Sequence, residues 1–398
     1  IPEEVIEAYG EKSISFGKEQ IIPKPLDPRL IYKVAPAVAK AAMESKVAKQ
    51  PITDWEKYEH QLKKRLGLDN KLLRDITLKA QSSPKKVVFT EGDNIKILKA
   101  AQISYEEGIA IPVLLGRKSK ILALMEEYAI ELPEVEIVDP KGDEEAERRE
   151  LYGQSYFEMR KRKGFTEFEA IQIMRERNYF GSMMVNEGDA DAMITGVTRG
   201  YRSCIKPALS SVGMQKDVKI ISGMYILNTK RGPLFLADTT INLNPTAEEL
   251  AEITVNVAKT IRKFQVNPRI ALLSYSNFGS SPGADAEKMG EAVKILHENH
   301  PNIIVDGEVQ ANFALDTDLM NEKFSFSQIA NRHVNTLIFP NLSAGNISYK
   351  LLQNMVDGDA VGPILIGLKK SIHILQLGAS VREIINMVKI AVIDAKNK

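Results

Sequence analysis

The chain has 398 residues, of which 44% are hydrophobic and 26% are charged, and its formal net charge is +1. This length predicts two or three domains, and the small net charge gives no argument for binding nucleic acid or a membrane surface. No apolar run approaches the ~20 residues of a membrane helix. The single cysteine, Cys204, excludes an internal disulfide framework and is typical of a reducing compartment, so we expect a cytoplasmic protein.

The N-terminal part differs in character from the rest of the chain. Residues 21–30 contain three prolines, which predict an extended and rigid segment. The alanine-rich stretch 34–48 has helical apolar spacing, and we expect its helix to end before Pro51. Because the chain begins at Ile1 without methionine, we expect a piece of a longer protein. Residues 54–82 are charged and helical in pattern, which predicts a connector of surface helices.

From residue 85 onward, short apolar runs alternate with amphipathic helical patterns. The first unit has an apolar run at 85–93 that ends in an acidic glycine turn, a helix stopped at Gly108, and a strand at 109–116. This alternation predicts a mostly parallel sheet covered by helices on both faces. Further strands are expected at 135–138, 192–195, 219–227, 234–237, 269–274, 303–306 and 336–339.

Candidate binding residues lie in the loops after these strands, because ligands of open α/β sheets bind beyond the carboxyl ends of the strands. The loop after 192–195 combines small hydroxyl residues with cations just before a helix, a composition that suits phosphate or pyrophosphate. A basic surface loop is the alternative. The candidates are Thr195, Thr198, Arg199, Arg202 and Lys206.

The strand at 269–274 leads into a second candidate loop, rich in serine and glycine. Its backbone N–H groups are expected to surround a phosphate near Ser276, Gly279 and Ser280. An ordinary strand–helix turn with serine caps explains the pattern equally well. The loop lacks the lysine of a Walker motif, which argues against a nucleoside triphosphate site.

Other polar residues indicate structural roles more than chemistry. Asn244 precedes a proline and a helical pattern, so we expect it to cap that helix. Asp306 and Glu308 are candidates for acid–base chemistry or metal binding, but structural contacts at a strand end are favoured. The five histidines show no metal-ligand spacing, so neither a metal site nor a nucleophilic triad is predicted.

Two parts of the chain resemble known families. Residues 21–48, with IIPKPLDPRL and APAVAKAAM, are similar to the end of bacterial malic enzymes, although a proline-rich linker before any alanine-rich helix is the alternative. From about residue 54 the chain resembles the phosphate acetyltransferase (phosphotransacetylase) family, which moves an acetyl group between coenzyme A and phosphate. The segments SYFEMRKRKGFTEFEA at 155–170, KPAL at 206–209 and TLIFPNLSAGNISYKLLQNM at 336–355 carry this resemblance.

The resemblance implies further ligand-binding residues. Arg160 matches a substrate-binding arginine of the family, although a solvated helix end is the alternative. Lys206 replaces a second family arginine, which keeps the charge but loses the bidentate fork. Asn346 and Gly362 lie in turns that the family shares along its cleft. Acetyl-CoA or CoA is therefore the implied ligand of this cleft.

The catalytic positions of the family are altered in this chain. Where the family has a Ser-Arg pair and an Asp, this chain has Gln376, Leu377 and Glu383. Leu377 cannot stabilise developing charge, and the longer Glu383 side chain displaces the base by about an ångström, enough to cost ~100-fold in rate. No intact catalytic group is therefore expected.

The resemblance also implies the architecture. We expect two three-layer α/β subdomains of the phosphotransacetylase type, which is isocitrate/isopropylmalate dehydrogenase-like, with a cleft between them and a helical or extended malic enzyme tail before them. The expected parts are the malic enzyme end at 1–53, a helical connector at 54–84, a first subdomain at 85–215 and 367–398, and a second at 216–366.

At the level of function, the resemblance implies an acetyl-CoA-binding regulatory region of an NADP-dependent malic enzyme, without transferase activity of its own. An active phosphate acetyltransferase is the alternative, and a scaffold that only multimerises is a third. NADP and Mg²⁺ or Mn²⁺ are expected only in the malic enzyme domain, which these residues lack. Expected partners are that domain of the same chain and further copies in a homodimer or larger homo-oligomer, with no nucleic acid and no membrane.

Overall fold

The computed structural model describes residues 21–22, 27, 29–55, 57–58, 61–62, 71–355 and 360–396. The chain divides into two compact units, residues 1–74 and 75–398. In the smaller unit, helix α2 (Arg29–Glu44) begins earlier than predicted and contains Pro36. It ends before Pro51 is reached, and the Ser45 hydroxyl donates to the Ala41 carbonyl at 2.7 Å in its last turn. The prolines predicted to make residues 21–30 extended lie outside the described residues.

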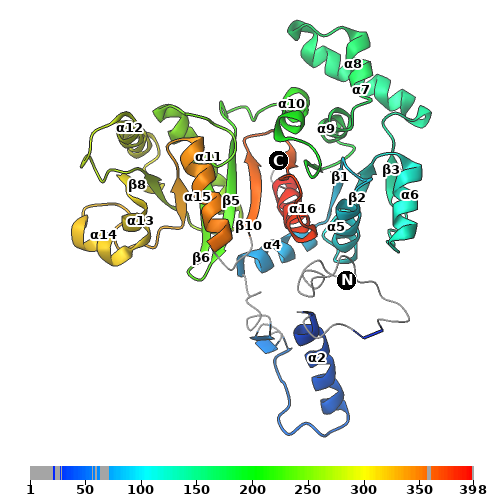
Figure 1. Cartoon of the computed structure of the whole chain (residues 1–398), viewed down its shortest axis with the longest axis horizontal. Coiled ribbons are helices and arrows are strands. Elements are labelled where there is room, and N and C mark those ends of the chain that lie inside the picture. The colour runs from blue at the N-terminus through cyan, green and yellow to red at the C-terminus, as the bar shows by residue number, and fades with distance from the viewer. Residues whose placement is uncertain are drawn as a thin grey trace. The chain divides into compact units, whose positions relative to one another are not determined.

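The larger unit begins within α4 (Lys71–Gln81) and contains two sheets (Figure 1). The first sheet has strand order β11-β4-β1-β2-β3, and every pair in it is parallel. Its strands are β1 (Lys85–Phe89), β2 (Ala110–Leu115), β3 (Glu136–Val138), β4 (Ala192–Thr195) and β11 (Ser371–Ile374).

Helices cover both faces of the first sheet. Helices α5 (Ile95–Glu106) and α16 (Val381–Lys396) pack together on one side. Helices α9 (Arg177–Glu187) and α10 (Tyr201–Ser211) pack together and contact β4 and β11, and α7 (Ala146–Arg160) and α8 (Glu167–Ile173) project beyond them (Figure 1). The unit also contains α6 (Lys118–Glu127) and the short 3₁₀ turns Asp143–Glu145 and Lys161–Lys163.

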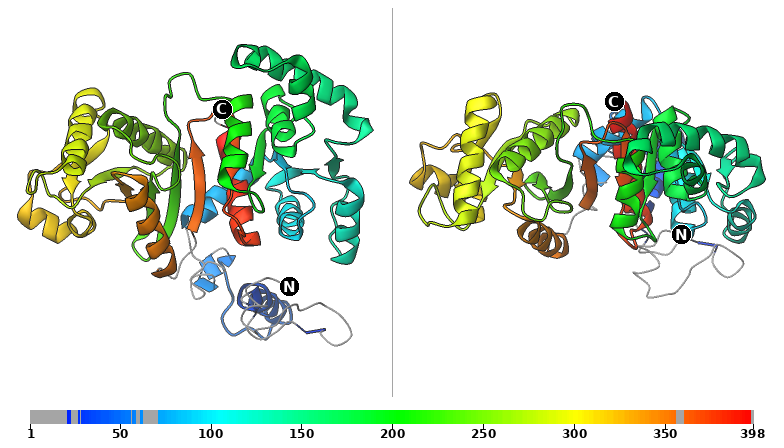
Figure 2. Two further views of the ribbon diagram at one scale, coloured as in Figure 1. Left: turned by 45° about the horizontal axis from the view of Figure 1, so that its top comes forward. Right: turned by 90° about the horizontal axis from the view of Figure 1, so that it is seen from above.

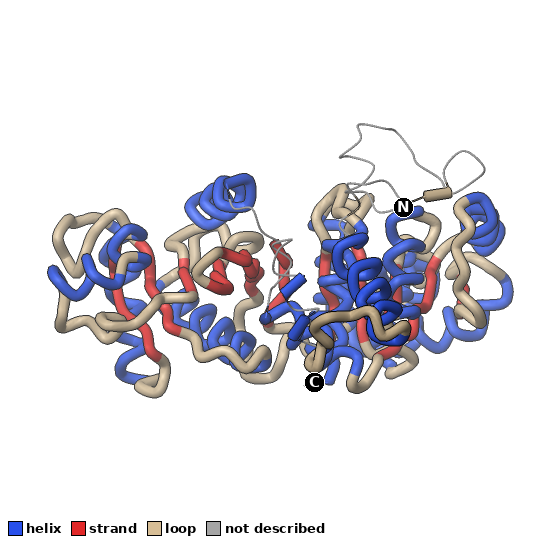
Figure 3. The backbone as a smooth tube through the Cα atoms, turned by 90° about the horizontal axis from the view of Figure 1, so that it is seen from below, coloured by secondary structure: helices blue, strands red, loops and turns tan. Residues whose placement is uncertain are grey.

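The second sheet is mixed, with strand order β10-β5-β6-β9-β7-β8. The pairs of β5 with β10 and β6 are antiparallel, and the remaining pairs are parallel. Its strands lie between layers of helices, as Figures 2 and 3 show. The strands are β5 (Ser222–Thr229), β6 (Gly232–Ala237), β7 (Arg269–Leu273), β8 (Ile304–Val309), β9 (Thr336–Ile338) and β10 (Ala360–Ile366); the helices are α11 (Ala247–Lys263), α12 (Ala284–Asn299), α13 (Ala311–Leu315), α14 (Thr317–Lys323) and α15 (Leu342–Met355).

The chain passes between the two sheets twice, and the two crossings are hydrogen-bonded to each other. The first crossing follows α10, and the second joins β10 to β11. The Gln215 N–H donates to the Gly367 carbonyl at 2.8 Å, and the Lys369 N–H donates to the Gly213 carbonyl at 3.0 Å. The predicted boundaries at 215/216 and 366/367 fall within these crossings. The strand arrangement is compatible with the predicted division into two subdomains, which stays a prediction.

Two sequence expectations are corrected here. Helix α11 is capped by Thr246, whose hydroxyl accepts from the Glu249 N–H at 3.2 Å, while the Glu249 carboxylate accepts from the Thr246 N–H at 2.8 Å. Asn244, the predicted cap, instead accepts from the Lys288 ammonium at 2.7 Å. Strands β10 and β11 were absent from the expected set. Among the helices described, none is long and apolar enough to cross a bilayer.

Candidate functional site

The carboxyl ends of four parallel strands meet at one edge of the first sheet and surround a pocket of about 500 Å³. The order of the strands changes direction here, because the chain proceeds from β1 through β2 to β3 on one side and then crosses to β4 on the other. Such a switch point is the usual ligand position in open α/β sheets. The pocket is lined by Glu91, Asp93, Asn94, Arg117, Lys120, Asp139, Pro140, Lys141, Arg175, Glu176, Arg177, Thr198 and Arg199.

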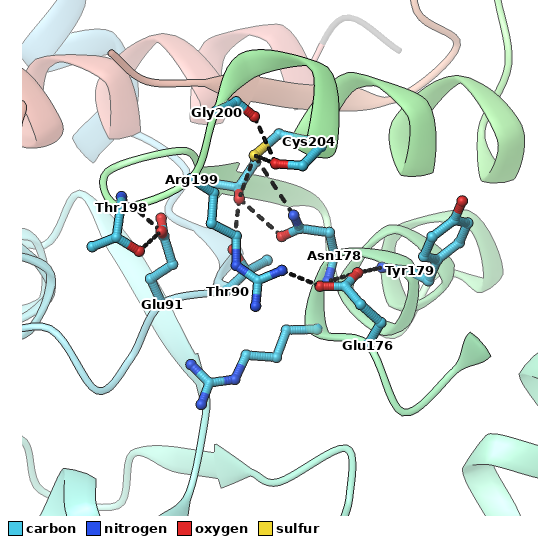
Figure 4. A network of polar contacts seen from close by, with 12 residues as sticks. Thr90, Glu91, Glu176, Asn178, Tyr179, Thr198, Arg199, Gly200 and Cys204 are labelled. Carbon is cyan, nitrogen blue, oxygen red and sulfur yellow. Dashed lines mark hydrogen bonds and ion pairs between the residues drawn. The ribbon is translucent and has the colours of Figure 1, made fainter. Parts of the chain in front are cut away.

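Glu91, directly beyond β1, holds the loop that follows β4 (Figure 4). One carboxylate oxygen accepts from the N–H groups of Gly196 and Val197, both at 2.8 Å, and the other accepts from the Thr198 N–H at 2.8 Å and from its hydroxyl. Glu91 is only 3% exposed. Three of the N–H groups in the predicted anion loop are therefore directed at a carboxylate of the protein itself.

Thr195, a predicted ligand, is fully buried in a polar network beneath the loop. Its hydroxyl accepts from the Thr90 hydroxyl at 2.8 Å and donates to the Asn178 side-chain oxygen at 2.9 Å. The Asn178 amide in turn donates to the Cys204 sulfur at 3.6 Å (Figure 4). Burial raises the pKa of the Cys204 thiol. The network ties β1, β4, α9 and α10 together, which is a structural role for Thr195.

Arg199 lines the pocket and forms an ion pair with Glu176 (Figure 4). The other Glu176 oxygen caps α9, accepting from the N–H groups of Asn178 at 2.9 Å and Tyr179 at 3.2 Å. One carboxylate thus fixes the Arg199 guanidinium relative to the start of a buried helix.

Asp93 forms a second ion-pair cluster in the pocket. Its two oxygens accept from the Arg177 guanidinium at 2.6 and 3.1 Å, and the Lys120 ammonium lies 3.3 Å away. The Arg177 hydrogen bonds hold the pKa of Asp93 at about 2, well below its ordinary value. The same carboxylate raises the pKa of Arg177. The Asp93 side chain is 18% exposed, so this pair is shielded from most of the solvent.

The Asp93→Asn substitution tests this pair. Because the folded-state pKa of Asp93 is depressed, its stabilising contribution is present above about pH 4 and is lost as the pH falls towards 2. We expect Asp93→Asn to lower the free energy of unfolding by about 1–2 kcal/mol at pH 7, and the gap to wild type to narrow below pH 4. Urea unfolding measures both. The control is Glu291→Gln, in an exposed pair with Lys294, which should change the free energy of unfolding by less than ~0.5 kcal/mol. A stability difference between Asp93→Asn and wild type that does not vary with pH would contradict the ion pair of Asp93 with Arg177.

The remaining predicted cations lie outside this pocket. Arg202 and Lys206 are exposed on α10. Arg160 is the last residue of α7, and its Nε is buried without a hydrogen-bond partner in the described part of the chain. That orphaned donor is unusual for a solvated helix end. Of the four predicted cations, the structure therefore places Arg199 in the pocket, Arg202 and Lys206 on α10, and Arg160 at the end of α7.

The predicted Ser/Gly loop after β7 is also closed on a carboxylate. Glu308 accepts from the Ser276 hydroxyl at 2.9 Å and from the Gly279 N–H at 2.6 Å. Ser280 accepts from the Asn277 N–H at 2.9 Å. Asp306 similarly accepts from the hydroxyl of Ser327 at 2.7 Å and from backbone N–H groups. Asp306 and Glu308 thus make polar contacts of the kind favoured from the sequence, and their roles stay a prediction.

Gln376, at the first altered catalytic position, links the two sheets. Its side-chain oxygen accepts from the Lys350 ammonium at 2.7 Å, and its amide donates to the Tyr225 hydroxyl. Tyr225 stacks on Tyr349 with ring centroids 3.7 Å apart. Gly362, in β10, lies close against the Tyr225 ring, because a Cβ there would come within 2.6 Å of it. Burial raises the pKa of Tyr225 far above its ordinary range, so its hydroxyl stays protonated.

The other two altered positions carry no catalytic arrangement. Leu377 is 66% exposed. The Glu383 carboxylate accepts from the Ser380 N–H at 2.8 Å and from its hydroxyl at 3.0 Å, while the Ser380 hydroxyl accepts from the Glu383 N–H. This reciprocal pair is a capping box at the start of α16. Asn346, in α15, donates to the Thr239 carbonyl at 3.1 Å.

Comparison with known proteins decides the family. Residues 71–392 match the model of the family described as phosphate acetyl/butaryl transferase. The chain belongs to this family. As a phosphate acetyl/butaryl transferase family member, it is 34% identical over 332 residues to the phosphate acetyltransferase of Clostridium acetobutylicum, covering 82% of this chain and 98% of the relative. A phosphotransacetylase structure from Streptococcus pyogenes matches with a TM-score of 0.77 at 32% identity, covering 82% of this chain and 98% of that one, which confirms the predicted fold.

A second group of relatives extends over the N-terminal part. The NADP-dependent malic enzyme of Escherichia coli (strain K12) is 39% identical over 401 residues, covering 100% of this chain and 52% of the relative. The chain thus spans about half the length of the malic enzymes it matches. Both resemblances seen in the sequence are confirmed by these relatives.

Glu91, Asp93, Glu176 and Arg177 line the candidate pocket, and sequence reasoning missed them. The sequence marks the first two only as an acidic turn after a strand, and the last two as charges at a helix start. For Glu91 and Asp93, the position beyond the carboxyl end of a predicted strand was the available signal; Glu176 and Arg177 follow no strand and carried no such signal.

Proposed function

We propose that this region binds acetyl-CoA without transferring its acetyl group, and that binding regulates an NADP-dependent malic enzyme of which it is a part. The observation that carries the proposal is the state of the family's catalytic positions. Leu377 offers no cation, and Glu383 serves as a helix cap. Acetyl transfer needs charge stabilisation and a positioned base, and neither position supplies them.

Several features favour a retained binding site. Arg160 has a buried Nε without a hydrogen-bond partner among the residues that the structure describes, and Arg202 and Lys206 are exposed, so these side chains offer cationic donors to an anionic ligand. Phosphate groups of acetyl-CoA are suitable acceptors for such donors.

The proposal assigns NADP and the divalent metal to the malic enzyme domain, and it includes a cytoplasmic homo-oligomer. Binding that shifts an equilibrium shared with that domain would couple the two sites.

An active phosphate acetyltransferase is the second candidate, and one observation favours it. Lys350 donates to Gln376 and supplies a cation beside the position where the family arginine is replaced. Partial burial lowers the pKa of Lys350. A lysine lacks the bidentate fork of arginine, so this cation is a weaker substitute for an acyl phosphate clamp.

Two measurements on the same preparation separate these functions. Calorimetric titration is expected to detect acetyl-CoA binding, and Lys206→Ala should weaken it about tenfold, since a charge-assisted hydrogen bond is lost. Lys216→Ala, an exposed lysine outside the predicted set, should leave affinity unchanged. A coupled assay with acetyl phosphate and CoA should give turnover well below ~1 per second, the low end for enzymes. Absence of binding at millimolar acetyl-CoA contradicts the regulatory proposal, and turnover above that rate supports the alternative.

A further inference from the structure

The pocket at the carboxyl edge of the first sheet has more positive than negative charge. Six cationic and four carboxylate side chains line it. Glu91 is satisfied by the loop after β4, Glu176 pairs with Arg199, and Asp93 pairs with Arg177 and Lys120. The negative charges of the pocket are thus largely committed to partners.

Among the residues that the structure describes, three cations of the same pocket have no carboxylate partner. Arg117, Lys141 and Arg175 are exposed, and no carboxylate lies within ion-pair distance of them in the described part of the chain. The Arg175 guanidinium donates to the Lys141 carbonyl at 3.4 Å. Asp139, the remaining carboxylate, accepts from the Lys141 N–H at 3.0 Å. The surplus positive charge therefore lies in the segments that follow β2 and β3 and just before the N-cap of α9.

The start of α6 adds a fixed positive end to this group. Its N-cap is Arg117, which makes no side-chain capping bond, and both Arg117 and Lys120 of the first turn line the pocket. An uncapped helix N-terminus leaves backbone N–H groups and the positive dipole end free for an anion. Two arginine forks beside it match the geometry of phosphate oxygens.

We propose that this pocket binds a phosphorylated small molecule, with Arg117, Lys141 and Arg175 as the phosphate-binding cations. Its volume of about 500 Å³ lies within the usual range for small-molecule sites. Gln376, Leu377 and Glu383 do not line it. The site is therefore separate from the altered catalytic positions, and its occupancy does not depend on the regulatory proposal.

Binding of pyrophosphate and of adenosine 3′,5′-bisphosphate, followed by calorimetry at constant ionic strength, tests the site. The double variant Arg117→Gln/Arg175→Gln should weaken both at least tenfold. Lys118→Gln, an exposed neighbour outside the lining, should change affinity by less than twofold. Since all three side chains are exposed, the folded state should persist, and circular dichroism checks this.

The outcomes show which class of phosphorylated ligand the pocket prefers, and which result would reject the pocket as a phosphate site. Tighter bisphosphate than pyrophosphate binding supports a nucleotide-type ligand, and the reverse supports a free polyphosphate. The proposal is overturned if neither ligand binds at millimolar concentration. It is also overturned if Lys118→Gln loses as much affinity as the double variant, or if succinate binds as tightly as the two phosphate ligands. Acetyl-CoA titration of Lys206→Ala reports on the cleft, so failure of one proposal is distinguishable from failure of the other.

Discussion

Replacing Glu91 with glutamine is expected to lower the free energy of unfolding of this chain by about 2–4 kcal/mol, because buried N–H groups lose their acceptor. In the native structure one oxygen of Glu91 accepts from Gly196 and Val197, and the other accepts from Thr198. A glutamine keeps one carbonyl oxygen but directs an NH₂ group at the remaining N–H donors. The isosteric change therefore tests charge and acceptor number without altering volume.

Urea unfolding at pH 7, followed by circular dichroism, measures this loss. Glu106→Gln is the matched control, because Glu106 is exposed and its carboxylate accepts from the Gln102 side chain on α5, so this change should alter stability by less than ~0.5 kcal/mol. Pyrophosphate affinity provides a second readout, since the loop held by Glu91 contributes Thr198 and Arg199 to the pocket. Equal stability of Glu91→Gln and Glu106→Gln would show that Glu91 does not hold the loop.

Gly345→Ala is expected to cost about 2–4 kcal/mol, because the added methyl group has no space. A Cβ at this position would lie 2.2 Å from the Asp238 carbonyl oxygen and 3.3 Å from the Phe339 ring. The backbone at Asp238 cannot yield easily, since its carboxylate accepts from the N–H groups of Gly223, Thr240, Ile241 and Asn242. The start of α15 must therefore move, which also disturbs the bond from Asn346 to Thr239.

Gly200→Ala is the control for this substitution. Gly200 is the N-cap of α10 with φ of −62°, and a Cβ there meets nothing within 4 Å, so alanine causes no clash and should cost less than about 1 kcal/mol, the difference between glycine and alanine at an N-cap. Thermal and urea unfolding compare the two variants with wild type. Similar stability of all three proteins would mean that α15 relaxes without penalty, and that the close approach to Asp238 is not a constraint.

The strands that sequence patterns predicted are those with continuous apolar runs. β1, β2 and β4 are buried along most of their length, and such runs survive in the sequence as blocks of Val, Ile and Leu. β10 contains a Gly362–Pro363 pair, which normally argues against a strand, and β11 has four residues including the fully buried His373. Their pairing with distant strands overrides these local signals.

Loop composition predicted the presence of cations but not the directions in which they point. Thr195 ends β4 and Arg199 lies in the loop that follows it, yet Thr195 is buried and Arg199 lines a pocket. The acceptor that fixes this loop, Glu91, lies 105 residues from Gly196 in the chain. A single sequence does not reveal such pairings, because they follow from the order of strands in the sheet.

The paired crossings between the sheets have a consequence for how this chain can be rearranged. Gln215 and Gly367, which are hydrogen-bonded to each other, mark the two places where the chain enters and leaves residues 216–366. A segment whose two ends lie together can be deleted, replaced or circularly permuted without changing the path of the rest of the chain. Joining the chain directly across this contact should therefore leave the parallel sheet of β11-β4-β1-β2-β3 with all its strands in order.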